Sequence, residues 1–239
     1  MINQIRSEWV KMRSVRSTLV MLATAVFLAV GVAVIVGIKT NGTIDTASSL
    51  LGVQLATMLF AVLGVQVIGQ EYRFNTIRPT FSTVSSRSRV IGAKLITMLA
   101  SVAVAGATLI AGAIGAAALI ANLRGIPFDL SSGDATRVIV GTFVSTLLAA
   151  AFGYGIGAIV RQPIAGIMIA LIWSLVAEPI VSGLLPKVGK WMPLSSATNL
   201  GGTEVLDNFL SPLAGGLYSA AIMCALVAVG SRRIATTDA

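Results

Sequence analysis

The chain has 239 residues, of which 56% are hydrophobic and 11% are charged, so little sequence remains for a soluble domain. Its net charge of +8 could suit nucleic acid, but the basic residues do not cluster as a groove-binding patch would. Histidine is absent, which excludes His-ligated haem, His-ligated zinc, most proton relays and a Ser/His/Asp triad. The sequence also lacks a G-x-x-x-x-G-K-S/T loop to cradle a nucleotide, so any chemical energy must come from another chain.

The first predicted element is an interfacial helix over residues 1–17. A single apolar stripe at spacings of three and four is formed by Ile2, Ile5, Trp9 and Met12. Lys11 falls on the far side of this helix and Arg13 flanks one edge, where its side chain can reach lipid headgroups. We expect Trp9, Lys11 and Arg13 to anchor the helix at a membrane surface. A basic juxtamembrane tail without helical structure is the alternative.

Six apolar stretches follow, each reaching or exceeding the roughly 20 residues that a helix needs to span about 30 Å of hydrocarbon. They are 18–38, 49–69, 93–121, 137–160, 164–185 and 212–230. A transmembrane barrel would instead show alternating segments of ~10 residues, and the sequence has none. We therefore predict an all-α integral membrane protein with one transmembrane domain over residues 1–239.

The basic residues predict the orientation of these spans. With the N-terminus inside, twelve basic residues fall on inner segments: Arg6, Lys11, Arg13, Arg16, Arg73, Arg78, Arg87, Arg89, Lys94, Arg161, Arg232 and Arg233. Five fall on outer segments: Lys39, Arg124, Arg137, Lys187 and Lys190. This positive-inside bias predicts a multi-pass protein of the cell membrane with both termini in the cytoplasm.

Within the spans, small and polar residues indicate packing and a candidate substrate path. Gly153 and Gly157 form a GxxxG pair, which lets helix backbones approach closely in lipid. Cys224, the only cysteine, sits in the last span and is interpreted as a small buried side chain. Polar groups in a span tend to face protein or a cavity, so a path is predicted along Gln54, Met58, Trp173 and Glu178. Structural packing of the same residues is the alternative, as is a position of Glu178 at the outer membrane edge.

Two polar segments between the spans stand out. The inner segment 70–92 carries Glu71, Tyr72, Arg73 and Arg78 ahead of Pro79, which predicts a short helix that continues the second span. This segment is either a docking surface for a partner or a solvated linker, and the sequence leaves both interpretations open. The outer segment 184–211 is apolar for a free loop, and a short re-entrant hairpin is predicted there.

Together these pieces resemble the type 2 ABC exporter permeases, in particular the short six-span forms of actinobacteria. The resemblance covers essentially the whole chain. It is carried by S-E-W-V-K-M-R-S at 7–14, G-Q-E-Y-R-F-N-T-I-R-P at 69–79 with its continuation over 87–94, and W-M-P-L-S at 191–195. Asn75 stands where the family often has glycine, and Ser85 where a proline is common.

The resemblance implies an N-terminal elbow helix, a cytoplasmic coupling helix and a re-entrant outer element before the last span. It further implies that two permeases pair and that each binds a separate ATPase, which carries ATP and Mg while this chain has no cofactor, metal or catalytic residue. Glu71, Tyr72, Arg73 and Arg78 would then contact the ATPase. The expected function is export of an amphipathic or hydrophobic substrate. An ion- or proton-coupled secondary transporter and a non-transporting assembly or immunity protein are the alternatives.

Overall fold

The computed structural model describes the chain except for residues 1, 15, 75–86, 131–134, 203–209 and 238–239. In chain order the elements are α1 (Ile2–Ser14), α2 (Arg16–Lys39), β1 (Ile44–Asp45), α3 (Thr46–Arg73), α5 (Arg87–Arg124), β2 (Phe128–Asp129), α6 (Ala135–Val160), α7 (Pro163–Ile172), the π-helix η1 (Trp173–Ala177), α8 (Glu178–Leu184), α9 (Pro186–Gly189), α10 (Pro193–Thr198), the 3-10 helix η2 (Asn199–Gly201) and α11 (Pro212–Thr237). In the described part of the chain, six helical rods are long and apolar enough to cross a membrane, with α7, η1 and α8 forming the fifth. The predicted all-α membrane fold is confirmed.

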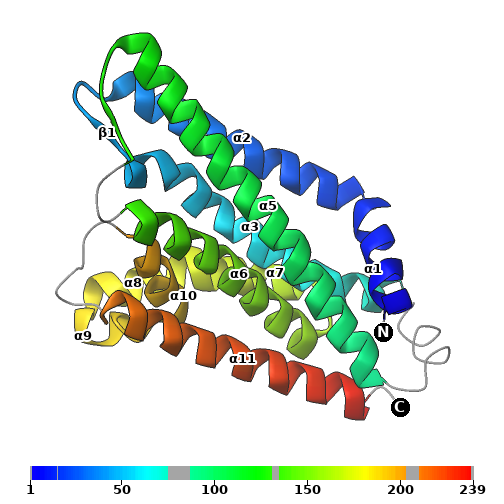
Figure 1. The fold of residues 1–239 in the computed structure, drawn as a ribbon. Helices are drawn as coiled ribbons and strands as arrows, with labels where there is room; N and C mark the ends of the chain where they lie inside the picture. Colours follow the sequence, from blue (N-terminus) through cyan, green and yellow to red (C-terminus); the bar gives the residue numbers. More distant parts are fainter. Residues whose placement is uncertain (1, 15, 75–86, 131–134, 203–209, 238–239) are drawn as a thin grey trace.

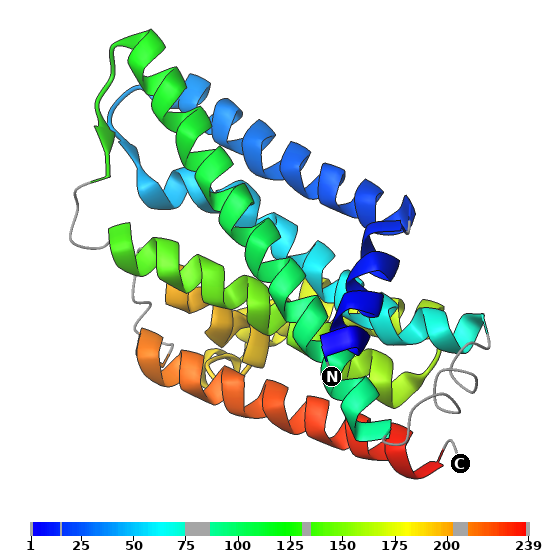
Figure 2. The same cartoon turned by 45° about the vertical axis from the view of Figure 1, so that its right-hand side comes forward.

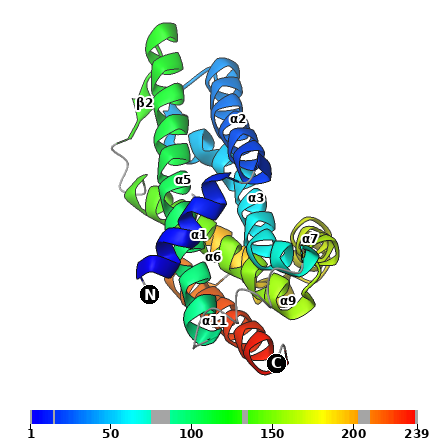
Figure 3. The same cartoon turned by 90° about the vertical axis from the view of Figure 1, so that its right-hand side faces the viewer.

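The spans form one elongated bundle. Helices α2 and α5 run along one side and α11 along the opposite side, with α3 and α6 between them (Figures 1 and 3). Helix α1 crosses one end of the bundle, and the last turns of α11 lie at that same end (Figure 2). We call this the α1 end and the opposite one the β1 end. The ends of the chain therefore share a side, as an even number of spans requires.

At the β1 end, the α2–α3 connection contacts the α5–α6 connection. Strands β1 and β2 pair in parallel, with Ile44 opposite Phe128. Nη1 of Arg124 donates to the carbonyls of Gly37 and Thr40, both at 2.7 Å. These two acceptors belong to the last turn of α2 and the residue after it, whose carbonyls have no partner within the helix. Arg124 therefore caps α2 from the end of α5.

The centre of the bundle depends on close backbone contact between α3 and α6. A Cβ added at Gly157 would lie 2.8 Å from the carbonyl oxygen of Val65, and one at Gly153 would overlap the carbonyl oxygen of Ala61. Such an approach is possible only without side chains at these positions, as predicted from the GxxxG spacing.

Replacing Gly153 with alanine should destabilise the protein by roughly 1–3 kcal/mol, because an overpacked contact forces two helices apart. Thermal unfolding in detergent measures the effect. Gly115→Ala in α5 is the control, since among the described residues no atom outside its own helical turn lies within 4 Å of the Cβ position at Gly115. Equal unfolding temperatures for the two variants would contradict the tight α3–α6 contact.

Several predicted details differ from the structure. Helix α5 begins at Arg87 and α11 continues to Thr237, beyond the predicted boundaries of 93 and 230, because backbone hydrogen bonding continues past the apolar run. The predicted burial of Cys224 is wrong, since its side chain is exposed on α11. The fifth span contains Pro179 and continues past it to Leu184 through a widened turn.

Candidate functional site

A cavity of about 220 Å³ opens among α3, α6, η1, α8 and α10, and we call it the Glu178 cavity. Its lining residues are Thr57, Met58, Ala61, Ser145, Ala149, Ser174, Glu178, Pro179, Leu194, Ser195, Ala197 and Thr198. Thr57 comes eleven residues after Thr46, where α3 begins, which places it about 16 Å along the helix. The cavity therefore reaches toward the middle of the spans.

Glu178 is almost fully enclosed, with 1% of its surface exposed. Its Oε1 accepts hydrogen bonds from Nε1 of Trp173 at 2.7 Å and from the backbone N–H of Leu194 at 3.0 Å. Its Oε2 accepts from the backbone N–H of Ser195 at 2.6 Å and from the Ser195 hydroxyl at 2.8 Å. Leu194 and Ser195 stand in the first turn of α10, whose N–H groups lack partners within that helix. Glu178 therefore caps α10 from a different helix, and it does not lie at an exposed membrane edge.

Trp173 and Glu178 lie at the two ends of a π-helical turn. In η1 the N–H of Glu178 reaches the carbonyl of Trp173, five residues earlier, instead of four. The turn lies directly before Pro179, which has no N–H and whose ring crowds the preceding turn of an α-helix. Widening this turn lets the span continue past the proline.

Helix α10, in the segment between the fifth and sixth spans, packs back against the bundle. The Ser145 hydroxyl of α6 donates to the carbonyl of Ala197 at 2.5 Å. The Ser219 hydroxyl of α11 donates to the carbonyl of Pro193 at 2.7 Å. Since both hydroxyls belong to spans, α10 is held from two sides and forms one wall of the cavity.

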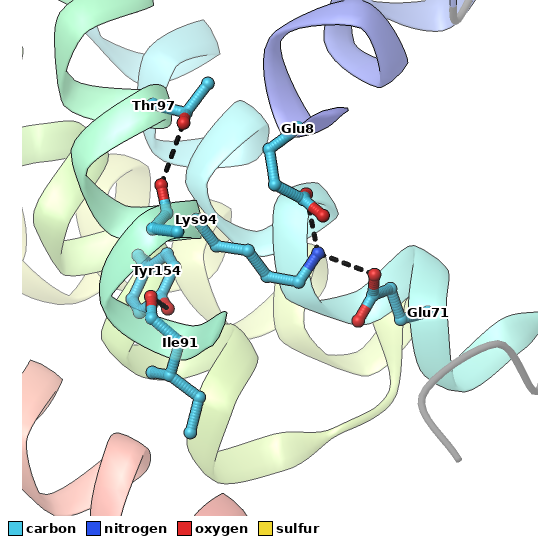
Figure 4. Close-up of polar contacts among 7 residues, drawn as sticks. Glu8, Glu71, Ile91, Lys94, Thr97 and Tyr154 are labelled. Atoms are coloured by element: carbon cyan, nitrogen blue, oxygen red, sulfur yellow. Dashed lines mark hydrogen bonds and ion pairs between the residues drawn. The ribbon is translucent and has the colours of Figure 1, made fainter. Parts of the chain in front are cut away.

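A second polar cluster lies at the α1 end (Figure 4), and we call Lys94, Glu8 and Glu71 the Lys94 triad. Nζ of Lys94 lies 2.6 Å from Oε2 of Glu8 and 2.5 Å from Oε1 of Glu71. All three residues are buried, with 3% of Lys94 and 8% of each glutamate exposed. Each comes from a different helix, so the triad joins α5, α1 and α3. Beside it, the Tyr154 hydroxyl of α6 donates to the carbonyl of Ile91 at 3.0 Å.

The residues predicted to contact an ATPase differ in how exposed they are. Helix α3 continues unbroken through Arg73, as predicted. Glu71, however, faces the bundle as part of the triad, and Tyr72 is half-buried with the guanidinium carbon of Arg161 6.0 Å from its ring centre. Arg73 is exposed, and Arg78 lies outside the described residues. The interpretation of Glu71 as a merely solvated boundary charge is wrong, because Lys94 holds its carboxylate inside the protein.

The predicted path and anchor residues are partly brought together. Met58 and Glu178 line the same cavity, and Trp173, although 38% exposed, is bonded to Glu178. Gln54 is half-buried and is not among the cavity residues. At the other end, Trp9 of α1 is 37% exposed. Lys11 and Arg13 lie within α1, but their side chains are outside the described part of the structure.

The sequence alone did not single out Lys94, Ser145 or Ser195. Lys94 was counted only as an inner charge, yet it stands within the apolar run V-I-G-A-K-L-I at 90–96, where a charge requires a partner. That signal could have predicted a buried ion pair, although not its partners. No comparable signal marks the serines.

The fold and these two clusters define a multi-pass helical membrane protein with a cavity in one half and a buried ionic cluster at one end. In the part of the chain that is described, no group of three or more acidic, histidine or cysteine side chains could hold a metal ion. No protein-family model and no curated protein matches the chain.

Proposed function

We propose that this chain is the membrane-spanning permease subunit of an ATP-driven exporter, powered by a separate ATPase that binds ATP and Mg. The observation that carries the proposal is the continuity of α3. One unbroken helix lines the Glu178 cavity with Thr57, Met58 and Ala61 and then runs to Arg73 at the α1 end. Such a rod can transmit movement from a contact at its end to the cavity, as coupling between distant sites requires.

The sequence motif that resembles ABC exporter permeases spans residues 69–79, and its described part, residues 69–74, forms this end of α3. In this arrangement the α1 end faces the cytoplasm of the cell membrane, in agreement with the distribution of basic residues. The ATPase contact involves the exposed Arg73 and the following segment with Arg78. Glu71 acts indirectly, because the Lys94 triad links the end of α3 to α1 and α5.

A second candidate, an ion- or proton-coupled transporter, is favoured by the buried carboxylate of Glu178. Each oxygen of that carboxylate already accepts two hydrogen bonds from the protein itself. A coupled proton or metal ion must bind directly to a carboxylate oxygen, and it would have to displace one of these donors, whereas a positive charge beside the carboxylate would not. The ATP-driven mechanism requires no such exchange and is the one we propose.

The proposal is tested by purifying the tagged full-length chain from membranes of its host in a mild detergent. We expect an ATP-hydrolysing chain to co-purify, and the mass of the complex to contain two permease copies or one copy and a sibling permease. ATP, and not an ion gradient alone, should drive export from sealed vesicles. A complex of one permease and one ATPase would contradict the pairing, and recovery without any ATPase would contradict the function.

Reversing the charge of Arg73 should weaken ATPase association at least tenfold, because Arg73→Glu changes an exposed charge at the proposed contact. Co-purification yield and ATP hydrolysis measure the effect. Lys39→Glu is the matched control, since Lys39 is an exposed basic residue at the other end of the bundle. If Arg73→Glu retains the ATPase as well as Lys39→Glu does, Arg73 is not part of the contact.

A further inference from the structure

The carboxylate of Glu178 has enough hydrogen bonds but no counter-charge. Its four donors are an indole N–H, two backbone N–H groups and a hydroxyl, all of them neutral. None of the described cavity residues is a lysine or arginine, and no salt bridge to Glu178 is found among the described residues. A buried charge without an opposite charge is costly at membrane depth, so such residues normally have an ionic partner.

The polar groups around the cavity are acceptors. The hydroxyl hydrogens of its serines and threonines are directed to protein oxygens: Thr57 to Gln54, Ser145 to Gly141 and Ala197, Ser174 to Ala170 and Leu171, Ser195 to Glu178, and Thr198 to Ser195. The first turn of α10 is occupied as well, since Leu194 and Ser195 donate to Glu178 and Ser196 donates to Met192. The lining therefore offers oxygen lone pairs and negative charge, but no spare donor for an anion.

The remaining lining is apolar and comes from Met58, Ala61, Ala149, Leu194 and Ala197. A cavity of ~150 Å³ holds benzene, so about 220 Å³ has room for a phenyl ring with a short polar arm. The size, negative charge and accepting oxygens of the cavity thus all favour a small apolar molecule that carries a positive, hydrogen-bond-donating group.

We propose that the Glu178 cavity binds a small organic cation, an ammonium group on an apolar body. The ammonium supplies the missing counter-charge to Glu178 and donates to the free lone pairs of the cavity hydroxyls, while the apolar body packs against Met58 and Ala149. The binding of this cation to the cavity does not depend on the proposed function. Its role as the exported substrate does depend on it.

The test uses three probes of similar size and different charge: 2-phenylethylammonium, 2-phenylethanol and phenylacetate. Calorimetry on the full-length chain in detergent, with a detergent blank, gives each dissociation constant. We expect the ammonium to bind at least tenfold more tightly than the alcohol, and phenylacetate to show no binding. Phenylacetate binding as tightly as the ammonium, or no binding by the ammonium, would overturn the proposal.

Two variants locate the binding in this cavity. Glu178→Gln should remove the preference for charge, so that ammonium and alcohol bind within threefold of each other. Ala149→Leu fills the cavity without touching the hydrogen bonds of Glu178 and should abolish binding of the ammonium, which keeps the test valid if Glu178→Gln does not fold. Ala107→Leu, at an exposed position of α5, is the control and should leave binding unchanged.

Unchanged ammonium binding in Ala149→Leu would overturn the assignment to this cavity. Because these measurements need no ATPase, they fail independently of the proposed function. Selective ammonium binding without a co-purifying ATPase would support the cation site and overturn the exporter function. A co-purifying ATPase without ammonium binding would support the exporter function and overturn the cation site.

Discussion

Replacing Lys94 with methionine is expected to destabilise the protein by roughly 3–5 kcal/mol, because it removes the buried ammonium that contacts the carboxylates of both Glu8 and Glu71. Lys94 lies 2.6 Å from one carboxylate and 2.5 Å from the other, and only 3% of it is exposed. Without this shared ammonium the two carboxylates would repel each other more strongly. The end of α3 and helix α1 should therefore separate from α5.

Thermal unfolding in detergent measures the loss of stability, and hydrogen exchange of the α1 amides measures the release of that helix. Lys187→Met, which removes an exposed lysine at the β1 end, is the control and should have little effect. A loss of less than ~1 kcal/mol for Lys94→Met, the range of exposed ion pairs, would show that the triad is not effectively buried.

A rescue experiment separates the electrostatic cause from simple loss of packing. Adding Glu8→Gln and Glu71→Gln to Lys94→Met removes both carboxylate charges, so most of the lost stability should return. Replacing a whole buried ionic cluster is often far less costly than removing one member. If the triple variant is as unstable as Lys94→Met alone, the lysine contributes by packing and not by charge.

The sequence was sufficient for the spans because length and apolarity are local properties. Five of the six predicted stretches lie wholly within membrane-length helices of the structure, and the remaining one, 164–185, extends one residue beyond its helical rod, Pro163–Leu184. The GxxxG spacing likewise predicted that α6 packs closely against another helix, and the structure shows that this helix is α3. The boundaries were less accurate, since a helix such as α5 continues beyond the apolar stretch that reveals it.

The polar clusters could not be predicted in the same way because their members are far apart in sequence. Lys94 comes 86 positions after Glu8, and Ser195 comes 17 positions after Glu178, beyond the rest of α8 and the whole of α9. Glu178 and Met58 were singled out as candidate path residues, but what holds the carboxylate is the first turn of α10. That arrangement depends on how the outer segment folds back, which no local pattern specifies.

Removing the carboxylate of Glu178 should release α10 from the fifth span. In Glu178→Ala the indole N–H of Trp173 and the backbone N–H groups of Leu194 and Ser195 lose their acceptor, which now lies between 2.6 and 3.0 Å away. Truncating one side of a buried, hydrogen-bonded charge cluster costs roughly 2–5 kcal/mol. We therefore expect a lower unfolding temperature and a local loosening of residues 193–201.

The local effect distinguishes a cap from general packing. Hydrogen exchange at Leu194 and Ser195 should accelerate strongly in Glu178→Ala and less in Glu178→Gln, whose amide retains one accepting oxygen but turns an N–H₂ group toward the remaining donors. Ser174→Ala is the control within the same cavity, because the Ser174 hydroxyl bonds only to carbonyls of its own helical turn. If the exchange of Leu194 and Ser195 in Glu178→Ala matches that of Ser174→Ala, α10 is held by Ser145 and Ser219 alone, and Glu178 does not fix the wall of the cavity.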